Sequence, residues 1–183
     1  MKIKLKDFLE KKTLILGEVG SGKTALTAKI LEELVNHGYG DEITVIDMAP
    51  DKIGEIGGKL RDYTEKTREV RYLTPPKIYA PRTTARSPSE LLRMAKHNAD
   101  VLRKILEDFL KNPTPILIVN DLSIYFHAGD LELIIECLEI SKTFLANSYY
   151  GRKIYEDYGT GVTERERNLV NRLILRVDKV VLL

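Results

Sequence analysis

Short β-prone runs alternate with longer amphipathic segments along this chain of 183 residues. The β-prone runs, bounded by polar or turn-forming residues, are 13–16, 43–46, 116–119 and 180–183. Apolar positions at helical spacing lie between them, over about 23–36, 88–111, 130–141 and 163–176. Strands that alternate with helices in this way predict an α/β domain built around a mainly parallel sheet.

Local signals refine the boundaries of these elements. The sequences SPSE at 87–90 and TERE at 163–166 both match a capping box, so each is expected to begin a helix. Residues 143–147 fit either a continuation of the preceding helix or a further strand. The segment 74–88 combines prolines and polar residues with no acidic residue, which predicts a mobile loop.

The motif that carries chemistry lies where the first strand meets the first helix. Residues 17–24 read GEVGSGKT, a complete G-x-x-x-x-G-K-[ST] with a strand before it and a helix after it. Glycines let the backbone wrap around an anion, and the helix N-terminus directs its positive dipole end to the same place. Lys23 is expected to reach the β- and γ-phosphates, and the Thr24 hydroxyl is expected to bind Mg²⁺.

This motif resembles the Walker A motif of the P-loop NTPase superfamily. A chance match in a chain of this composition has a probability below roughly 1%. The resemblance implies a three-layer α/β/α fold, Mg²⁺ as cofactor and a nucleotide such as ATP as ligand or substrate. The residues that it assigns to nucleotide binding are Gly17, Glu18, Val19, Gly20, Ser21, Gly22, Lys23, Thr24 and Ala25.

A P-loop site also needs an acid near the magnesium ion, usually at the end of a neighbouring buried strand. The run ILIVND at 116–121 is the best candidate for this Walker B element. Asp121 is either the magnesium-shell acid, displaced by one residue, or the group that activates water while Asn120 takes the magnesium-shell place. We favour the magnesium role, and both versions expect this strand to lie beside the P-loop strand. The catalytic candidates are thus Lys23, Asp121 and Asn120.

A second acidic residue, Asp47, ends the strand predicted at 43–46 and is expected at the same edge of the sheet. The run VID at 45–47, with Pro50 after it, is similar to the second strand of hexameric DNA-pumping ATPases. The alternative interpretation of Asp47 is a turn cap. The candidate metal ligands are thus Thr24, Asp121 and Asp47.

Two arginines, Arg82 and Arg86, lie in the predicted loop 74–88. An arginine that reaches γ-phosphate oxygens stabilises the charge of the transition state, and kinases close such loops over the nucleotide. A solvated side chain in a basic loop is nevertheless the favoured interpretation of either arginine. His127 follows the Walker B candidate and could approach a ligand, although a lone histidine is more often structural.

The bound nucleotide is expected to be ATP rather than GTP. GTP-specific P-loop proteins read guanine with an Asn-Lys-x-Asp motif, which this sequence lacks. The favoured function is an ATPase that couples hydrolysis to a conformational cycle or to a protein or nucleic-acid partner. The alternatives are a small-molecule or nucleotide kinase with an arginine-bearing lid and a non-catalytic ATP-sensing module.

Composition sets the remaining limits. Lys and Arg number 29 against 27 Asp and Glu, which excludes a strongly basic protein but not a local basic patch. No apolar run approaches about 18 residues, so we expect a cytoplasmic single domain over 1–183 with no membrane partner. Charged residues make up 31% and both Trp and Gln are absent, a composition typical of thermophiles.

Overall fold

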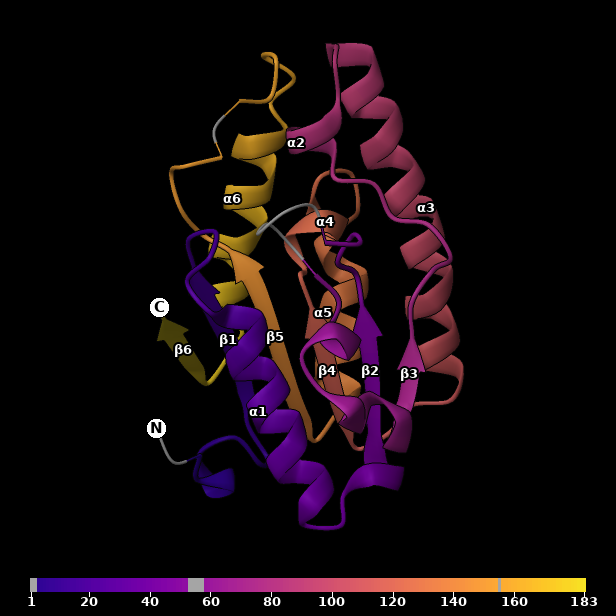
Figure 1. Cartoon of the computed structure of the whole chain (residues 1–183), viewed down its shortest axis with the longest axis vertical. Coiled ribbons are helices and arrows are strands. Elements are labelled where there is room, and N and C mark those ends of the chain that lie inside the picture. Colours follow the sequence, from indigo (N-terminus) through magenta and orange to yellow (C-terminus); the bar gives the residue numbers. More distant parts are fainter. Residues whose placement is uncertain (1–2, 53–57, 155) are drawn as a thin grey trace.

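A parallel β-sheet runs through the molecule with helices on both of its faces (Figure 1). The computed structural model describes residues 3–52, 58–154 and 156–183. Every pair of neighbouring strands in the sheet is parallel. The predicted α/β class is therefore confirmed. The strands are β1 Lys12–Gly17, β2 Ile43–Asp47, β3 Arg71–Leu73, β4 Ile116–Asn120, β5 Thr143–Tyr149 and β6 Lys179–Leu182.

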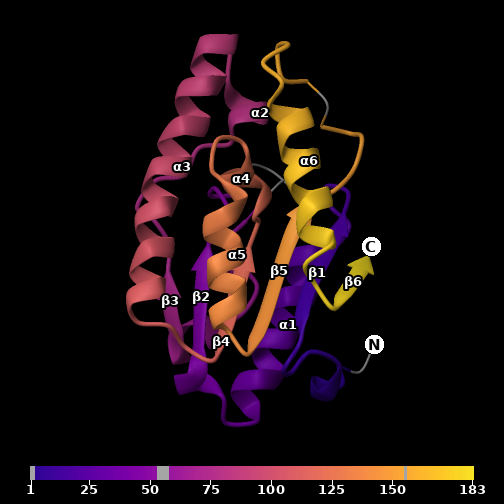
Figure 2. The same cartoon turned by 180° about the vertical axis from the view of Figure 1, so that it is seen from behind.

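The helices form two layers, as the resemblance to P-loop NTPases implied. Helix α1 covers one face of the sheet (Figure 1), and α3, α5 and α6 cover the other (Figure 2). The α-helices are α1 Lys23–Asn36, α2 Pro81–Thr84, α3 Pro88–Lys111, α4 Ser123–Phe126, α5 Leu131–Ile140 and α6 Val162–Ile174. Shorter 3₁₀ turns are η1 Leu5–Asp7, η2 Gly40–Glu42, η3 Leu60–Asp62 and η4 Glu65–Glu69.

The strand order is β3-β2-β4-β5-β1-β6, which places β5 between the P-loop strand and β4. The expectation that strand 116–119 lies beside the P-loop strand is therefore wrong. Residues 143–149 form the strand whose assignment the sequence left open, and it is buried along its whole length. Ile15 of β1 pairs with Asn147 of β5, and Val119 of β4 pairs with Ala146. A strand that is buried on both faces takes a central place in a parallel sheet.

Side chains of successive strand residues alternate between two hydrophobic cores. Ile15 of β1 packs with Leu31 of α1 in one cluster. Leu14 of β1 belongs to the other cluster, together with Phe109 of α3. All four side chains are completely buried. Helices on both faces thus explain why the strands read as nearly continuous apolar runs in the sequence.

One helix start agrees with its predicted capping box and the other does not. The Ser87 hydroxyl accepts a hydrogen bond from the Glu90 amide at 3.1 Å and caps α3. Helix α6 begins before Thr163, because Gly161 takes the left-handed conformation (φ 78°) and serves as its N-cap. The Thr163 amide instead donates to the Asp157 carboxylate at 3.0 Å. A glycine-based turn has therefore replaced the predicted cap.

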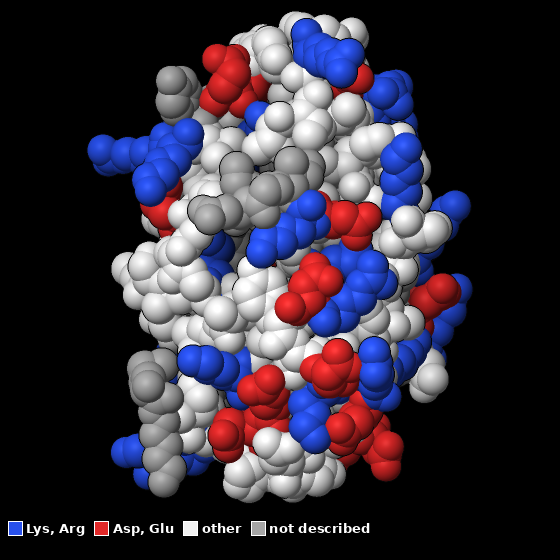
Figure 3. Space-filling view, viewed as in Figure 1, with Lys and Arg blue, Asp and Glu red and all other residues white. Residues whose placement is uncertain are grey.

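The surface carries charges of both signs. On the face drawn in Figure 3, Lys and Arg side chains are interspersed with Asp and Glu side chains. This mixture agrees with the small formal net charge of +2. Within the described parts of the chain, no helix is both long enough and apolar enough to span a membrane.

Candidate functional site

The P-loop connects the carboxyl end of β1 to the first turn of α1. Gly20 and Gly22 both have positive φ angles, 75° and 92°, so these turns favour glycine. Gly17 is restricted by space instead, since an added Cβ would lie 2.6 Å from the Leu183 carbonyl oxygen. These three glycines therefore lie at positions where a larger residue would be strained or would clash. Lys23 and Thr24 begin the helix that follows.

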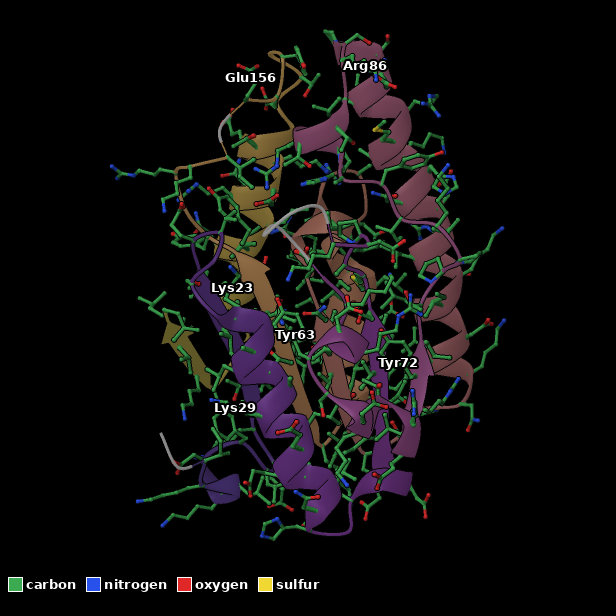
Figure 4. All side chains as sticks on the ribbon, viewed as in Figure 1. Lys23, Lys29, Tyr63, Tyr72, Arg86 and Glu156 are labelled. Carbon is green, nitrogen blue, oxygen red and sulfur yellow. The ribbon has the colours of Figure 1, made fainter. Side chains whose placement is uncertain are left out.

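The Lys23 ammonium folds back over its own loop. Its Nζ donates to the carbonyl oxygens of Gly17 at 3.0 Å and Glu18 at 2.6 Å. Burial lowers the pKa of Lys23, while Asp121 and Glu18 oppose that shift. Figure 4 shows Lys23 at one end of α1, next to the P-loop, with Lys29 farther along the same helix. A cation held in this way is suited to bind an anion.

A cavity of about 350 Å³ opens beside the P-loop. Its lining includes several of the predicted nucleotide-binding residues: Val19, Gly20, Gly22, Lys23, Thr24 and Ala25. Asp121, Ser123 and Asn147 line another part of its wall. The structure thus brings Lys23, Thr24 and Asp121 to one cavity, although Gly17, Glu18 and Ser21 lie in the loop away from this lining.

Asp121 occupies an unusual backbone conformation at the cavity wall. Its φ angle is 57°, a region that residues other than glycine rarely adopt and that often marks functional sites. Its amide donates to Asn147 Oδ1 at 2.9 Å, and its Oδ1 accepts from the Ser123 hydroxyl at 2.5 Å. Burial raises the pKa of the carboxyl, against the opposing effects of Ser123 and Lys23.

Asp47 and Asn120 lie outside the cavity in a buried polar row that crosses the carboxyl ends of the strands. Asn120 Nδ2 donates to Asp47 Oδ1 at 2.9 Å. Asp47 Oδ2 accepts from the Tyr72 hydroxyl and from the Leu60 amide, both at 2.6 Å. Burial and the nearby Asp47 raise the pKa of Tyr72, which keeps this hydroxyl a donor. The geometry therefore brings Asp47 together with Tyr72 and Leu60 rather than with Thr24.

Asn147 joins this polar row to the P-loop helix, and sequence reasoning missed it. Its Nδ2 donates to Asn120 Oδ1 at 2.8 Å and to Thr27 Oγ1 at 2.9 Å. Thr27 in turn donates to the Lys23 carbonyl at 2.9 Å. A buried amide after an apolar run was the available signal, but it becomes useful only once 143–149 is known to be a strand.

Arg82 is buried, contrary to the expectation of a solvated side chain. The segment 74–88 contains the short helix α2, and its Arg82 forms a 2.7 Å ion pair with Glu166. Only 5% of the Arg82 side chain is exposed. Its partner Glu166 lies on α6, 84 residues farther along the chain. Arg86 is exposed and lies far from Lys23 in Figure 4. The mobility of this segment stays a prediction.

The donor atoms at the cavity fit a magnesium ion. Thr24 offers a hydroxyl and Asp121 a carboxylate, both oxygen ligands of the kind that Mg²⁺ prefers. Within the described residues, no group of three or more His, Cys, Asp or Glu side chains could hold a metal without a ligand. Mg²⁺ is usually bound by one or two carboxylates together with substrate phosphates, so this sparse set suits it.

We predict that Asp121→Asn raises the free energy of unfolding at pH 7 by roughly 0.5–2 kcal/mol. The unfolded carboxyl ionises near its ordinary pKa of about 3.9, whereas burial raises the pKa in the folded protein. The charged form therefore destabilises the fold above the unfolded pKa. The difference should vanish near pH 3 and grow as the pH rises through the folded pKa.

Urea unfolding at several pH values measures this effect. Asp108→Asn, at an exposed position, is the control and should change the stability little. A variant at Asp121 that is no more stable than the original protein at pH 7 would contradict the predicted cost of burying this charge.

Comparison with known proteins agrees with this geometry. A family model described as Helicase HerA, central domain (DUF87) matches residues 1–174. No curated protein matches the chain. The family match covers nearly the whole chain and includes the P-loop, β4, β5 and α6. The chain therefore belongs to the HerA helicase central-domain family, a family of P-loop NTPases.

Proposed function

We propose that this protein is a Mg²⁺-dependent ATPase that couples ATP hydrolysis to movement on DNA. The observation that carries the proposal is the cavity that Lys23, Thr24 and Asp121 line together. A phosphate-binding loop, a hydroxyl and a carboxylate are the groups that phosphoryl transfer to water requires. The helicase name of the matching family supports DNA as the partner.

Each residue has a distinct task in this proposal. Lys23 exchanges its two loop carbonyl partners for phosphate oxygens, which brings its charge to the β- and γ-phosphates. The backbone amides of the P-loop and the N-terminus of α1 hold the same anion. Thr24 and Asp121 hold the magnesium ion, which when bound neutralises negative charge on the phosphates.

Asp121 is the acid that we assign to the magnesium shell. The side chain of Asn120 forms hydrogen bonds with Asp47 and Asn147 and does not line the cavity, whereas Asp121 does, which supports Asp121 over its neighbour. The alternative role of Asp121 is to activate the attacking water. Burial raises the pKa of its carboxyl, which also suits a base. The two roles differ in what they do to binding, so they can be separated by experiment.

The other two function classes have less support. The kinase alternative needs an arginine-bearing lid that closes over the nucleotide, whereas Arg82 is anchored to Glu166 by a buried ion pair. An ATP-sensing module would share the same cavity but would bind nucleotide without turnover. Turnover assays therefore decide between the ATPase and the sensor.

The direct test of the proposal is a phosphate-release assay with Mg-ATP, with and without double-stranded DNA. We expect turnover that requires Mg²⁺ and rises several-fold with DNA. We also expect no preference for GTP over ATP, because the sequence lacks the guanine-reading motif. Tight ATP binding without turnover would favour the sensor, and stimulation by a nucleoside acceptor instead of DNA would favour the kinase.

Lys23→Ala should abolish tight Mg-ATP binding and leave the fold intact. The Lys23 side chain contacts loop carbonyls and the cavity and contributes no apolar packing to either core. Lys29→Ala is the matched control, since Lys29 is an exposed lysine on the same helix (Figure 4). Calorimetry measures the affinities. Equal affinity in the Lys23 variant and the original protein would refute phosphate binding by this loop.

Asp121→Asn should weaken Mg-ATP binding and shift the metal dependence of turnover to higher Mg²⁺ concentrations. That is the outcome expected of a residue in the magnesium shell. If Asp121 activates water instead, the same change should preserve ATP affinity and remove turnover, because the interaction matters chiefly in the transition state. Titrations with Mg²⁺ at fixed ATP distinguish the two. A variant that is unchanged in affinity, metal dependence and turnover would exclude both roles.

A further inference from the structure

Three buried polar side chains form a cluster, and two of them line the cavity beside the P-loop. Arg82 of α2, His127 after α4 and Glu166 of α6 have side chains that are 5%, 2% and 4% exposed. Glu166 Oε2 accepts from Arg82 at 2.7 Å and from His127 Nε2 at 2.8 Å. Side chains from two distant parts of the sequence thus converge on one carboxylate oxygen of α6.

The guanidinium of Arg82 is fixed from several directions. A second hydrogen bond runs to the Ile154 carbonyl oxygen at 3.2 Å, and the Tyr149 ring lies 5.1 Å from the guanidinium carbon. Arginine carries five N–H donors. Among the described residues its side chain donates two hydrogen bonds, to the Ile154 carbonyl and to the Glu166 carboxylate.

His127 restrains the carboxylate that holds the arginine. Because a carboxylate only accepts hydrogen bonds, His127 Nε2 must carry the hydrogen in this contact. Glu166 is then oriented by a neighbour of its own and cannot rotate without losing two partners. His127 lines the same cavity as Asp121, so this cluster reaches the wall that holds the acid.

Fold stability alone is a weak reason to bury this ion pair. Burying a charge pair costs desolvation energy, and well-packed apolar residues are often as stable or more stable in its place. Arg82 and His127 also line the same cavity as Lys23 and Asp121. A second fixed cation therefore lines the cavity that the P-loop borders.

We propose that Arg82 contacts the terminal phosphate of the bound nucleotide, within the same chain, and that Glu166 and His127 are positioning residues that hold its guanidinium. This inference rests on the proposed ATPase function. An arginine placed there in advance stabilises charge that develops on the phosphoryl oxygens, and needs little rearrangement at the moment of reaction. Glu166 acts through Arg82 and contacts no reacting atom.

Arg82→Ala in the full chain should lower kcat for ATP by about 10³-fold or more, with a small change in KM. Arg82→Lys keeps the charge but loses the planar fork, so it should still lose at least about tenfold in kcat. It also carries the test if the alanine variant does not fold. Arg86→Ala, an exposed arginine in the same segment, is the control and should retain full activity.

The role of Glu166 is tested by a double-mutant cycle. Glu166→Gln keeps the size of the side chain and should lower kcat by about 10- to 100-fold with KM nearly unchanged. Added to Arg82→Ala it should cause no further loss, because a residue that acts through Arg82 has nothing left to position. Full additivity of the two losses would overturn the positioning role.

Binding measurements separate this inference from the proposed function. ADP with aluminium fluoride imitates the transferring phosphoryl group, and Arg82→Ala should weaken its binding by at least tenfold more than that of ADP alone. If Mg-ATP fails to bind the original protein, the proposed ATPase function fails. If it binds in a Lys23-dependent manner while Arg82→Ala changes neither turnover nor the binding of this analogue, only the arginine inference fails.

Discussion

The side-chain amide of Asn147 connects the parts of this site to one another. It lies near the carboxyl end of β5, the strand that separates the P-loop strand from β4. It forms hydrogen bonds with Thr27 of α1, Asn120 of β4 and the backbone of Asp121. Each bond satisfies a buried polar group that would otherwise cost about 1–3 kcal/mol. Because β5 lies between the two strands, the relative position of the P-loop helix and Asp121 depends on this amide.

The site also concentrates charge in a place where charge is costly. The side chains of Arg82 and Glu166 are buried and those of Lys23 and Asp121 are partly buried, and each makes a hydrogen bond that partly offsets its desolvation. Burial lowers the pKa of Lys23 and raises the pKa of Asp121, and both shifts favour the neutral form of the side chain. Charged groups with shifted pKa values contribute little to the stability of the fold. They are instead expected at a binding site for a highly charged ligand.

Features that depend on neighbouring residues could be predicted from the sequence, whereas features that depend on contacts between distant segments could not. The P-loop at 17–24 is contiguous, so its residue types alone indicate both its conformation and its chemistry. The strand order and the burial of Arg82 depend on contacts across 84 residues and on the placement of β5, which no local pattern records. At the start of α6 the local signal was itself misleading, because Gly161 competes with the predicted cap.

The two carbonyl oxygens that hold Lys23 act as internal competitors for its charge. A ligand gains from Lys23 only the difference between its own bond and the bonds to Gly17 and Glu18 that it displaces. A small singly charged anion offers little more than those carbonyls already provide. A polyphosphate that occupies the amides of the loop at the same time offers much more. The lysine thus lowers the affinity of the loop for anions in general but increases its preference for a polyphosphate over a small anion. This selection takes place at the binding step, before any phosphoryl transfer.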